Sequence, residues 1–291
     1  MNRRPMSLSA SVFIPAFPVL FVLALVSCAP KRVIKPSGPA VTLVYGGSVG
    51  EERRWSLEQS FRGKVVNLGM PQLVVVKARA VIGERIESVE GNGWRKVRMT
   101  TDMSPLEFNG MAVELGAVPP HAESLLMRSP AGDVEPMEKA EKGGDTMAWV
   151  ARSLGSTFPV LPPVPARPGE SWRREQDQAS PLGGTFNVVT IGVFEGMEEV
   201  DGVACARLRM EGGIDLKDAP KGGELELFRL EYKGVVRFVP GEGRLLDSVQ
   251  DGTLRLKGKM GKSPLEALLL FKSSLTPYRA AGSGAGAVPK K

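Results

Sequence analysis

The sequence predicts a mainly β protein made of two similar units of long antiparallel strands, with one bridging helix near residues 145–155. Apolar and polar residues alternate over long stretches, which is the period-two pattern of a strand with one dry face. Turn-forming pairs of an acidic residue and glycine interrupt these stretches. The two halves also match each other at a constant offset. Together these observations predict a duplicated, strand-rich body.

The first half shows the alternation from Arg54 to Val65, where Trp55, Leu57, Phe61 and Val65 fall on one side. Residues 74–82 repeat the pattern. The sequence Glu90–Gly93 then predicts a turn, and a second strand follows with Val97 and Met99 on its inner side. This arrangement predicts a hairpin.

In the second half, residues 186–193 and 204–210 flank the turn pair Asp201-Gly202. Residues 228–238 and 245–260 likewise flank Pro240–Gly243. Both pairs predict hairpins with one dry face. Ser263 opens a possible helix-capping box, while residues 268–275 could equally form a last strand, so the pattern there leaves both structures open.

The predicted helix begins after Asp145, and its apolar residues follow the spacing of one helical face: Met147, Val150, Ala151 and Leu154.

The two halves match when the sequence is shifted by 111 positions, which is the separation of Val89 and Val200. This shift also pairs Ile82 with Val193, Val97 with Leu208, and Leu125 with Val236. Two unrelated hairpins with acidic-glycine turns could match by chance, but the match persists over several turns and favours duplication.

A proline-rich bridge, "FPVLPPVPARPGESW", runs from Phe158 to Trp172. Its prolines lack the N–H groups that a sheet needs, so it predicts an extended connection. The motif from Pro165 to Trp172 resembles that of an uncharacterised bacterial family of exported β-rich proteins, which carry Pro-x-x-x-Gly-(Asp/Glu)-Ser-Trp at mid-chain. The resemblance implies export and β architecture, and it implies no activity.

The N-terminal segment predicts export and anchoring. Arg3 and Arg4 precede an apolar run of about 15 residues, too short to span a bilayer and typical of a secretory signal. Leu25-Val26-Ser27-Cys28 resembles the bacterial lipobox, whose cysteine is lipidated and becomes the mature N-terminus. The alternative is ordinary signal cleavage nearby. By resemblance to the enterobacterial sorting rule, Ala29 after the cysteine favours the outer membrane.

The predicted organisation has five parts. They are a signal peptide over 1–27, a lipidated cysteine with a flexible tether over 28–40, a first β unit with the helix over 41–157, a bridge and second β unit over 158–279, and a disordered tail over 280–291.

Without residues 1–27 the chain keeps 36 Lys and Arg against 32 acidic residues, a net charge of +4. This mild excess does not indicate nucleic-acid binding in an exported protein, and it is compatible with anionic lipid or glycan surfaces.

Few residues are suited to catalysis or metal binding. The only histidine, His121, has no nucleophile motif near it, and Ser171 lacks the second glycine of Gly-x-Ser-x-Gly. Cys205 has apolar neighbours, which predicts a buried, unreactive thiol. One histidine and one further cysteine are too few for a zinc site. We therefore expect no enzyme activity, catalytic residue, metal or cofactor.

The sequence instead predicts a membrane-anchored lipoprotein with a non-enzymatic binding or structural role in the cell envelope. Its expected partners are the membrane, reached through Cys28, and an envelope protein or a lipid. A row of apolar side chains could line a concave face that holds an acyl chain or a lipoprotein segment: Phe228, Leu230, Tyr232 and Phe238. The same side chains could instead form an ordinary core, and a hydrolase is the least favoured alternative.

Overall fold

The computed structural model describes residues 37–67, 69–113, 120–137, 158–179, 184–219, 225–260 and 263–279. These residues form thirteen β-strands and contain no helix. This confirms the prediction of a mainly β protein. The predicted helix at 145–155, the signal peptide with Cys28, and the tail from residue 280 all lie outside the described residues.

The strands that precede the bridge are β1 (Glu52–Asn67), β2 (Met70–Val89), β3 (Arg95–Met103), β4 (Leu106–Phe108), β5 (Met111–Val113), β6 (His121–Arg128) and β7 (Val134–Pro136). Those after it are β8 (Ser171–Ala179), β9 (Thr185–Val200), β10 (Val203–Asp218), β11 (Leu225–Val239), β12 (Arg244–Met260) and β13 (Ser263–Pro277). The sequence left residues 263–277 open between a helix and a strand, and β13 shows that they form a strand.

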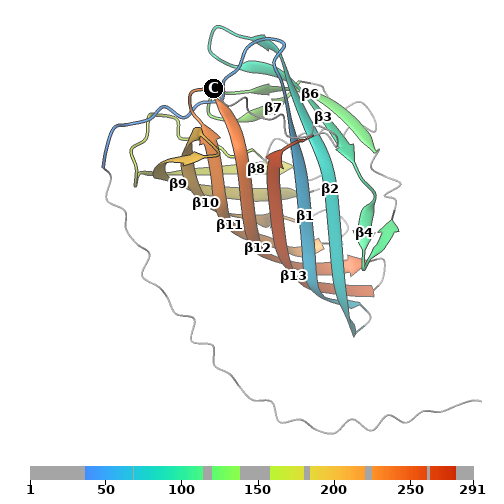
Figure 1. The fold of residues 1–291 in the computed structure, drawn as a ribbon. Helices are drawn as coiled ribbons and strands as arrows, with labels where there is room; N and C mark the ends of the chain where they lie inside the picture. The colour runs from blue at the N-terminus through green and yellow to red at the C-terminus, as the bar shows by residue number, and fades with distance from the viewer. Residues whose placement is uncertain are drawn as a thin grey trace, which may run out of the picture. The chain divides into compact units, whose positions relative to one another are not determined.

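All thirteen strands belong to one antiparallel sheet (Figure 1). Its order is β7-β6-β3-β2-β1-β13-β12-β11-β10-β9-β8; off this path, β4 pairs with β2, and β5 pairs with β4. The first and last long strands, β1 and β13, pair along their length from Trp55 with Pro277 to Asn67 with Leu265. The two ends of the described chain therefore meet at the centre of the sheet.

The structure does not support the predicted pair of duplicated β units. The two halves are joined through the pairing of β1 with β13 into one continuous sheet. The offset of 111 residues pairs Ile82, which is fully buried, with Val193, which is only half-buried. The fully buried residue at this place on β9 is the next one along the chain, Phe194. An irregularity in the pairing of β9 and β10 shifts the register between Arg207 and Leu208, and this breaks the match.

The core is shared by strands from both halves of the chain. Its fully buried residues include Ile82 of β2 and Val97 of β3, together with Phe194 of β9, Leu208 of β10 and Phe238 of β11. The sheet must therefore curl around a common interior, since its distant strands bury side chains against each other. We call the side that faces this interior the inner face.

Two irregular segments complete this interior. Leu43 and Tyr45 come from the segment before β1, and Phe158 and Leu161 come from the bridge before β8. The Tyr45 and Phe238 rings meet edge to face at 5.4 Å, and the Trp55 and Phe158 rings do so at 5.1 Å. Such pairs add to the stabilisation from burial. The proline-rich bridge is thus also a core element.

Glycines allow neighbouring strands to approach closely away from the core. A Cβ atom at Gly63 would lie 2.0 Å from the backbone oxygen of Leu268, and one at Gly252 would lie 2.0 Å from that of Glu231. These separations exclude any side chain unless the backbone moves, so glycine permits the local bend of the sheet.

Among the described residues no helix is long and apolar enough to cross a membrane.

Candidate functional site

The inner face extends beyond the core along β9 to β13 and β1. There, side chains project inward at every second residue. On β11, Phe228, Leu230 and Tyr232 are half-buried on this face, whereas Phe238 is fully buried inside the core. Three of the four residues predicted to line an apolar face therefore lie outside the core, and the fourth belongs to it.

Side chains of β9, which is separated from β11 by β10, extend the row of Phe228, Leu230 and Tyr232. The Phe186 ring of β9 meets the Phe228 ring at 5.0 Å, and the Tyr232 hydroxyl lies 3.2 Å from the Thr190 hydroxyl. Burial raises the pKa of Tyr232, so this side chain stays neutral at physiological pH. The row is therefore a continuous and uncharged surface.

No charged side chain occurs at the inward positions of this extension. We define the inner apolar face as the following described residues: Phe61, Gly63 and Val65 of β1; Phe186, Val188 and Thr190 of β9; Gly212, Ile214 and Leu216 of β10; Phe228, Leu230 and Tyr232 of β11; Gly252, Leu254 and Leu256 of β12; and Ala267, Leu269 and Phe271 of β13. Such a surface suits an apolar group and offers few polar contacts that would orient a reacting substrate.

A buried ion pair lies at the opposite, core end of the inner face. The Arg128 guanidinium donates two hydrogen bonds of 2.6 Å to the Glu84 carboxylate, and both side chains are almost completely buried. The Arg128 guanidinium carbon also lies 4.6 Å from the centroid of the Tyr45 ring. A second guanidinium, that of Arg53, is 3.8 Å from Glu84. The pair is therefore held by charge, hydrogen bonds and a ring contact.

The pKa values of Arg128 and Tyr45 in this cluster are both raised. Burial acts to lower the pKa of Arg128, but the charge and hydrogen bonds of Glu84 outweigh it, and the pKa of Arg128 is raised. Burial also raises the pKa of Tyr45 far above its usual value. The Tyr45 hydroxyl donates a hydrogen bond of 2.9 Å to the Pro159 carbonyl. The cluster thus links β2 and β6 to the bridge.

Sequence reasoning missed Glu84 and Arg128, although their positions held a signal. Glu84 alternates with the outward residues of β2 and so points inward, as Ile82 and Ile86 do. Arg128 points inward from β6 in the same way as Leu126. Two opposite charges that each interrupt an apolar row are typical of a buried pair. The strand order was needed to recognise them as partners.

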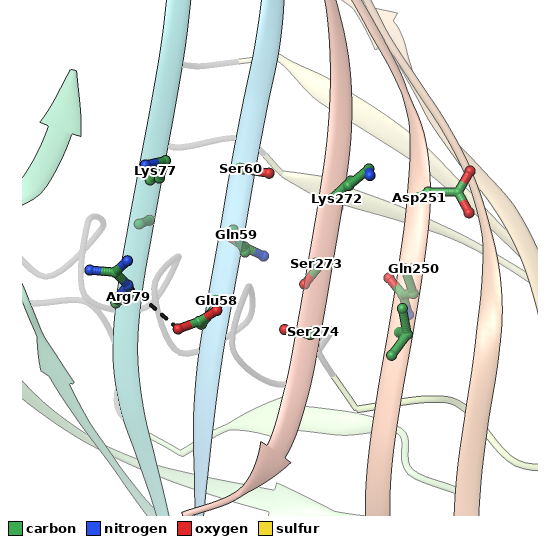
Figure 2. Close-up of a pocket in the computed structure, with 12 residues that line it drawn as sticks. Glu58, Gln59, Ser60, Lys77, Arg79, Gln250, Asp251, Lys272, Ser273 and Ser274 are labelled. Atoms are coloured by element: carbon green, nitrogen blue, oxygen red, sulfur yellow. Dashed lines mark ion pairs between the residues drawn. The ribbon is translucent and has the colours of Figure 1, made fainter. Parts of the chain in front are cut away.

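The surface also has a hollow of about 730 Å³ at the centre of the sheet, over β2, β1, β13 and β12 (Figure 2). Polar side chains dominate its lining, among them Gln59, Gln250 and Ser273. The only ion pair drawn there joins Arg79 to Glu58 at 3.5 Å, between two exposed side chains. Its lining thus includes charged side chains, unlike the inner apolar face.

The remaining residues that the sequence singled out are scattered. Cys28 lies outside the described residues. The exposed His121 Nδ1 is 2.7 Å from the Asp102 carboxylate on β3, while Ser171 is exposed at the start of β8. Cys205 is fully buried, as predicted, and burial raises the pKa of its thiol. In the described part of the chain no cluster of three or more His, Cys, Asp or Glu side chains could hold a metal ion.

Comparison with protein-family models and with curated protein sequences finds no match.

Proposed function

We propose that the protein is an exported, lipid-anchored protein of the bacterial cell envelope that acts by binding and not by catalysis. The observation that supports a binding role best is the inner apolar face, which continues past the core without a charged side chain. The lipobox-like sequence that ends at Cys28 supports the anchor. Dual or triple acylation would hold such a protein on a membrane.

Mass spectrometry of the mature N-terminus in a native host tests the anchor. We expect a chain that begins at an acylated Cys28, and we expect the Cys28→Ser variant to carry no acyl group. The neighbouring substitution Ser27→Ala is the control, since a small residue is kept before the cysteine. An unmodified Cys28 still joined to residues 1–27 would contradict the proposal.

The inner apolar face also favours a more specific function, that of a carrier for an acyl chain or a lipoprotein segment. Phe186 on β9 and Phe228 and Leu230 on β11 present half-buried apolar surface on either side of β10. Such side chains gain free energy when a ligand covers them, about 25 cal/mol for each Å² of apolar surface removed from water. A carrier also needs no catalytic group.

Lipid that purifies with the protein tests this function. Leu230→Glu would place a charge on the inner face and should remove bound lipid, as measured by mass spectrometry of an organic extract. The matched control is Leu227→Glu on the same strand, because Leu227 is already 40% exposed. Far-UV circular dichroism checks that both variants fold. Equal lipid in the two variants, or none in the wild type, would count against a carrier.

A further inference from the structure

The outer face of β1, β13 and β12 carries an unusual combination of exposed leucines and unpaired cations. On β13, Leu268 is 52% exposed and Leu270 is 61% exposed, although this strand lies near the middle of the sheet. Leu268 lies between Lys64 of β1 and Arg255 of β12 in the pairing register. An apolar side chain in such a place gains nothing from the core.

The two kinds of side chain alternate across the sheet. One row runs Leu73, Lys64, Leu268 and Arg255 over β2, β1, β13 and β12, and the next row places Arg62 between Val75 and Leu270. Neighbouring strands are about 4.8 Å apart, so Leu268 lies within reach of a cation on each side. Leu270 lies beside Arg62 on β1 and beside Thr253 on β12. We call these two rows, with Lys259 and Lys272 at their margins, the outer basic strip.

The cations of this strip lack acidic partners. Within the described ranges, Arg62, Lys64, Arg255, Lys259 and Lys272 form no ion pair. The one nearby pair joins Lys257 to Glu266 at 3.8 Å, between exposed side chains. Such a contact contributes little. No ion pair therefore neutralises Arg62, Lys64 or Arg255 at the centre of the strip, while Lys272 at its margin lies opposite Asp251 in the pairing register.

Arginines elsewhere on the same outer face are paired. Arg207 and Arg209 share Glu195 at 2.9 and 3.0 Å, and Arg237 lies 2.6 Å from Glu198. Arg207, Arg209 and Arg237 of β10 and β11 are thus neutralised by ion pairs, whereas Arg62 and Lys64 of β1 and Arg255 of β12 are not. This difference within one sheet calls for a partner that supplies negative charge to the strip.

We propose that the outer basic strip is a docking surface for an anionic lipid bilayer. Lipid phosphates would pair with Arg62, Lys64 and Arg255, and Leu268 and Leu270 would enter the boundary between headgroups and acyl chains. Peripheral proteins combine basic and apolar residues in this way on membranes. The proposal does not depend on acylation at Cys28, because the strip contacts the membrane through its own side chains.

Binding to vesicles tests the strip with the full-length chain carrying Cys28→Ser, which removes any acyl chain. We expect sedimentation with vesicles of phosphatidylglycerol and phosphatidylcholine, much weaker sedimentation with phosphatidylcholine alone, and loss of binding at high salt. The triple variant Arg62→Glu, Lys64→Glu and Arg255→Glu should reduce the partition coefficient about 100-fold or more, since each basic residue contributes about fivefold.

The control is a second triple variant with the same net charge: Arg54→Glu, Arg85→Glu and Arg167→Glu, at exposed cations away from the strip. It should bind as the unsubstituted chain does. Leu268→Ser with Leu270→Ser should weaken binding about tenfold, while Val164→Ser, at a site 66% exposed in the bridge, should not. Equal loss in the two triple variants, equal binding to both kinds of vesicle, or no binding at all would overturn the proposal.

Discussion

At the scale of single residues, the Glu84 and Arg128 pair determines how the core end of the sheet is built. Two buried charges cost desolvation energy, which their mutual attraction and hydrogen bonds largely offset. Removal of Glu84 leaves the buried Arg128 without a carboxylate partner, and removal of Arg128 leaves the buried Glu84 with only the Arg53 guanidinium at 3.8 Å. The pair should therefore tolerate joint replacement better than the loss of either member.

We expect Arg128→Met to lower the free energy of unfolding by about 3–5 kcal/mol, because Glu84 would lose its bidentate partner. The double variant Glu84→Leu and Arg128→Met should recover most of this loss. Urea unfolding followed by circular dichroism measures both. The control is Arg98→Met, at a half-exposed residue that pairs with Glu87; it should cost about 1 kcal/mol or less. A double variant as unstable as the single one would show that the charges themselves stabilise the fold.

Tyr45 predicts a specific loss of stability at alkaline pH. Burial raises the pKa of its hydroxyl in the folded protein, whereas in the unfolded chain the hydroxyl ionises near pH 10. The unfolded state therefore releases a proton that the folded state keeps, and the free energy of unfolding falls as pH rises above about 10. Below pH 10 this contribution is fully present.

The variant Tyr45→Phe should be less stable by about 1 kcal/mol at neutral pH, since the hydrogen bond to Pro159 is lost. Above about pH 10 the gap should shrink by up to about 1.4 kcal/mol per pH unit, because phenylalanine cannot ionise. Denaturant unfolding at a series of pH values measures the gap. The control Tyr278→Phe, at a tyrosine that is 39% exposed, should follow the wild type. A gap that is constant with pH would contradict this account.

At the scale of elements, the alternation of side chains predicted most strands and the inner side of each. It gave Val97 and Met99 as inward residues of β3, and both are buried. Alternation does not say which strand pairs with which, so the single sheet and the pairing of β1 with β13 could not be inferred. For the same reason the sequence could not show that Phe238 is fully buried in the core while Phe228 is half-buried. The burial of an inward side chain depends on which residues of other strands pack against it.

The glycines of the long strands should be sensitive to substitution according to their contacts. We expect Gly252→Ala to lower the free energy of unfolding by about 1–3 kcal/mol, since the added methyl group would overlap the backbone oxygen of Glu231. The control is Gly213→Ala on β10, where the added atom would lie 3.4 Å from its nearest neighbour. That change should stay within about 0.5 kcal/mol. Thermal unfolding compares them, and equal effects would show that the bend does not depend on Gly252.

At the scale of the whole molecule, the arrangement of the sheet determines how the protein unfolds. The first half contributes Trp55, Ile82 and Val97 to the core, and the second half contributes Phe194 and Leu208. Neither half can bury these side chains alone. The pairing of β1 with β13 further ties the two halves together along whole strands. Two independent β units would instead each have a core.

We therefore expect one cooperative unfolding transition. Tryptophan fluorescence, to which the buried Trp55 contributes, and far-UV circular dichroism should give the same midpoint in urea. Val97→Ala changes the first half and Leu208→Ala changes the second. For each variant, the midpoints from fluorescence and from circular dichroism should move by the same amount, and the free energy of unfolding should fall by about 2–4 kcal/mol. The exposed Val249→Ala is the control, because Val249 is 55% exposed on the outer face. If each substitution moved only a separate transition of its own half, the shared core would not be the unit of stability.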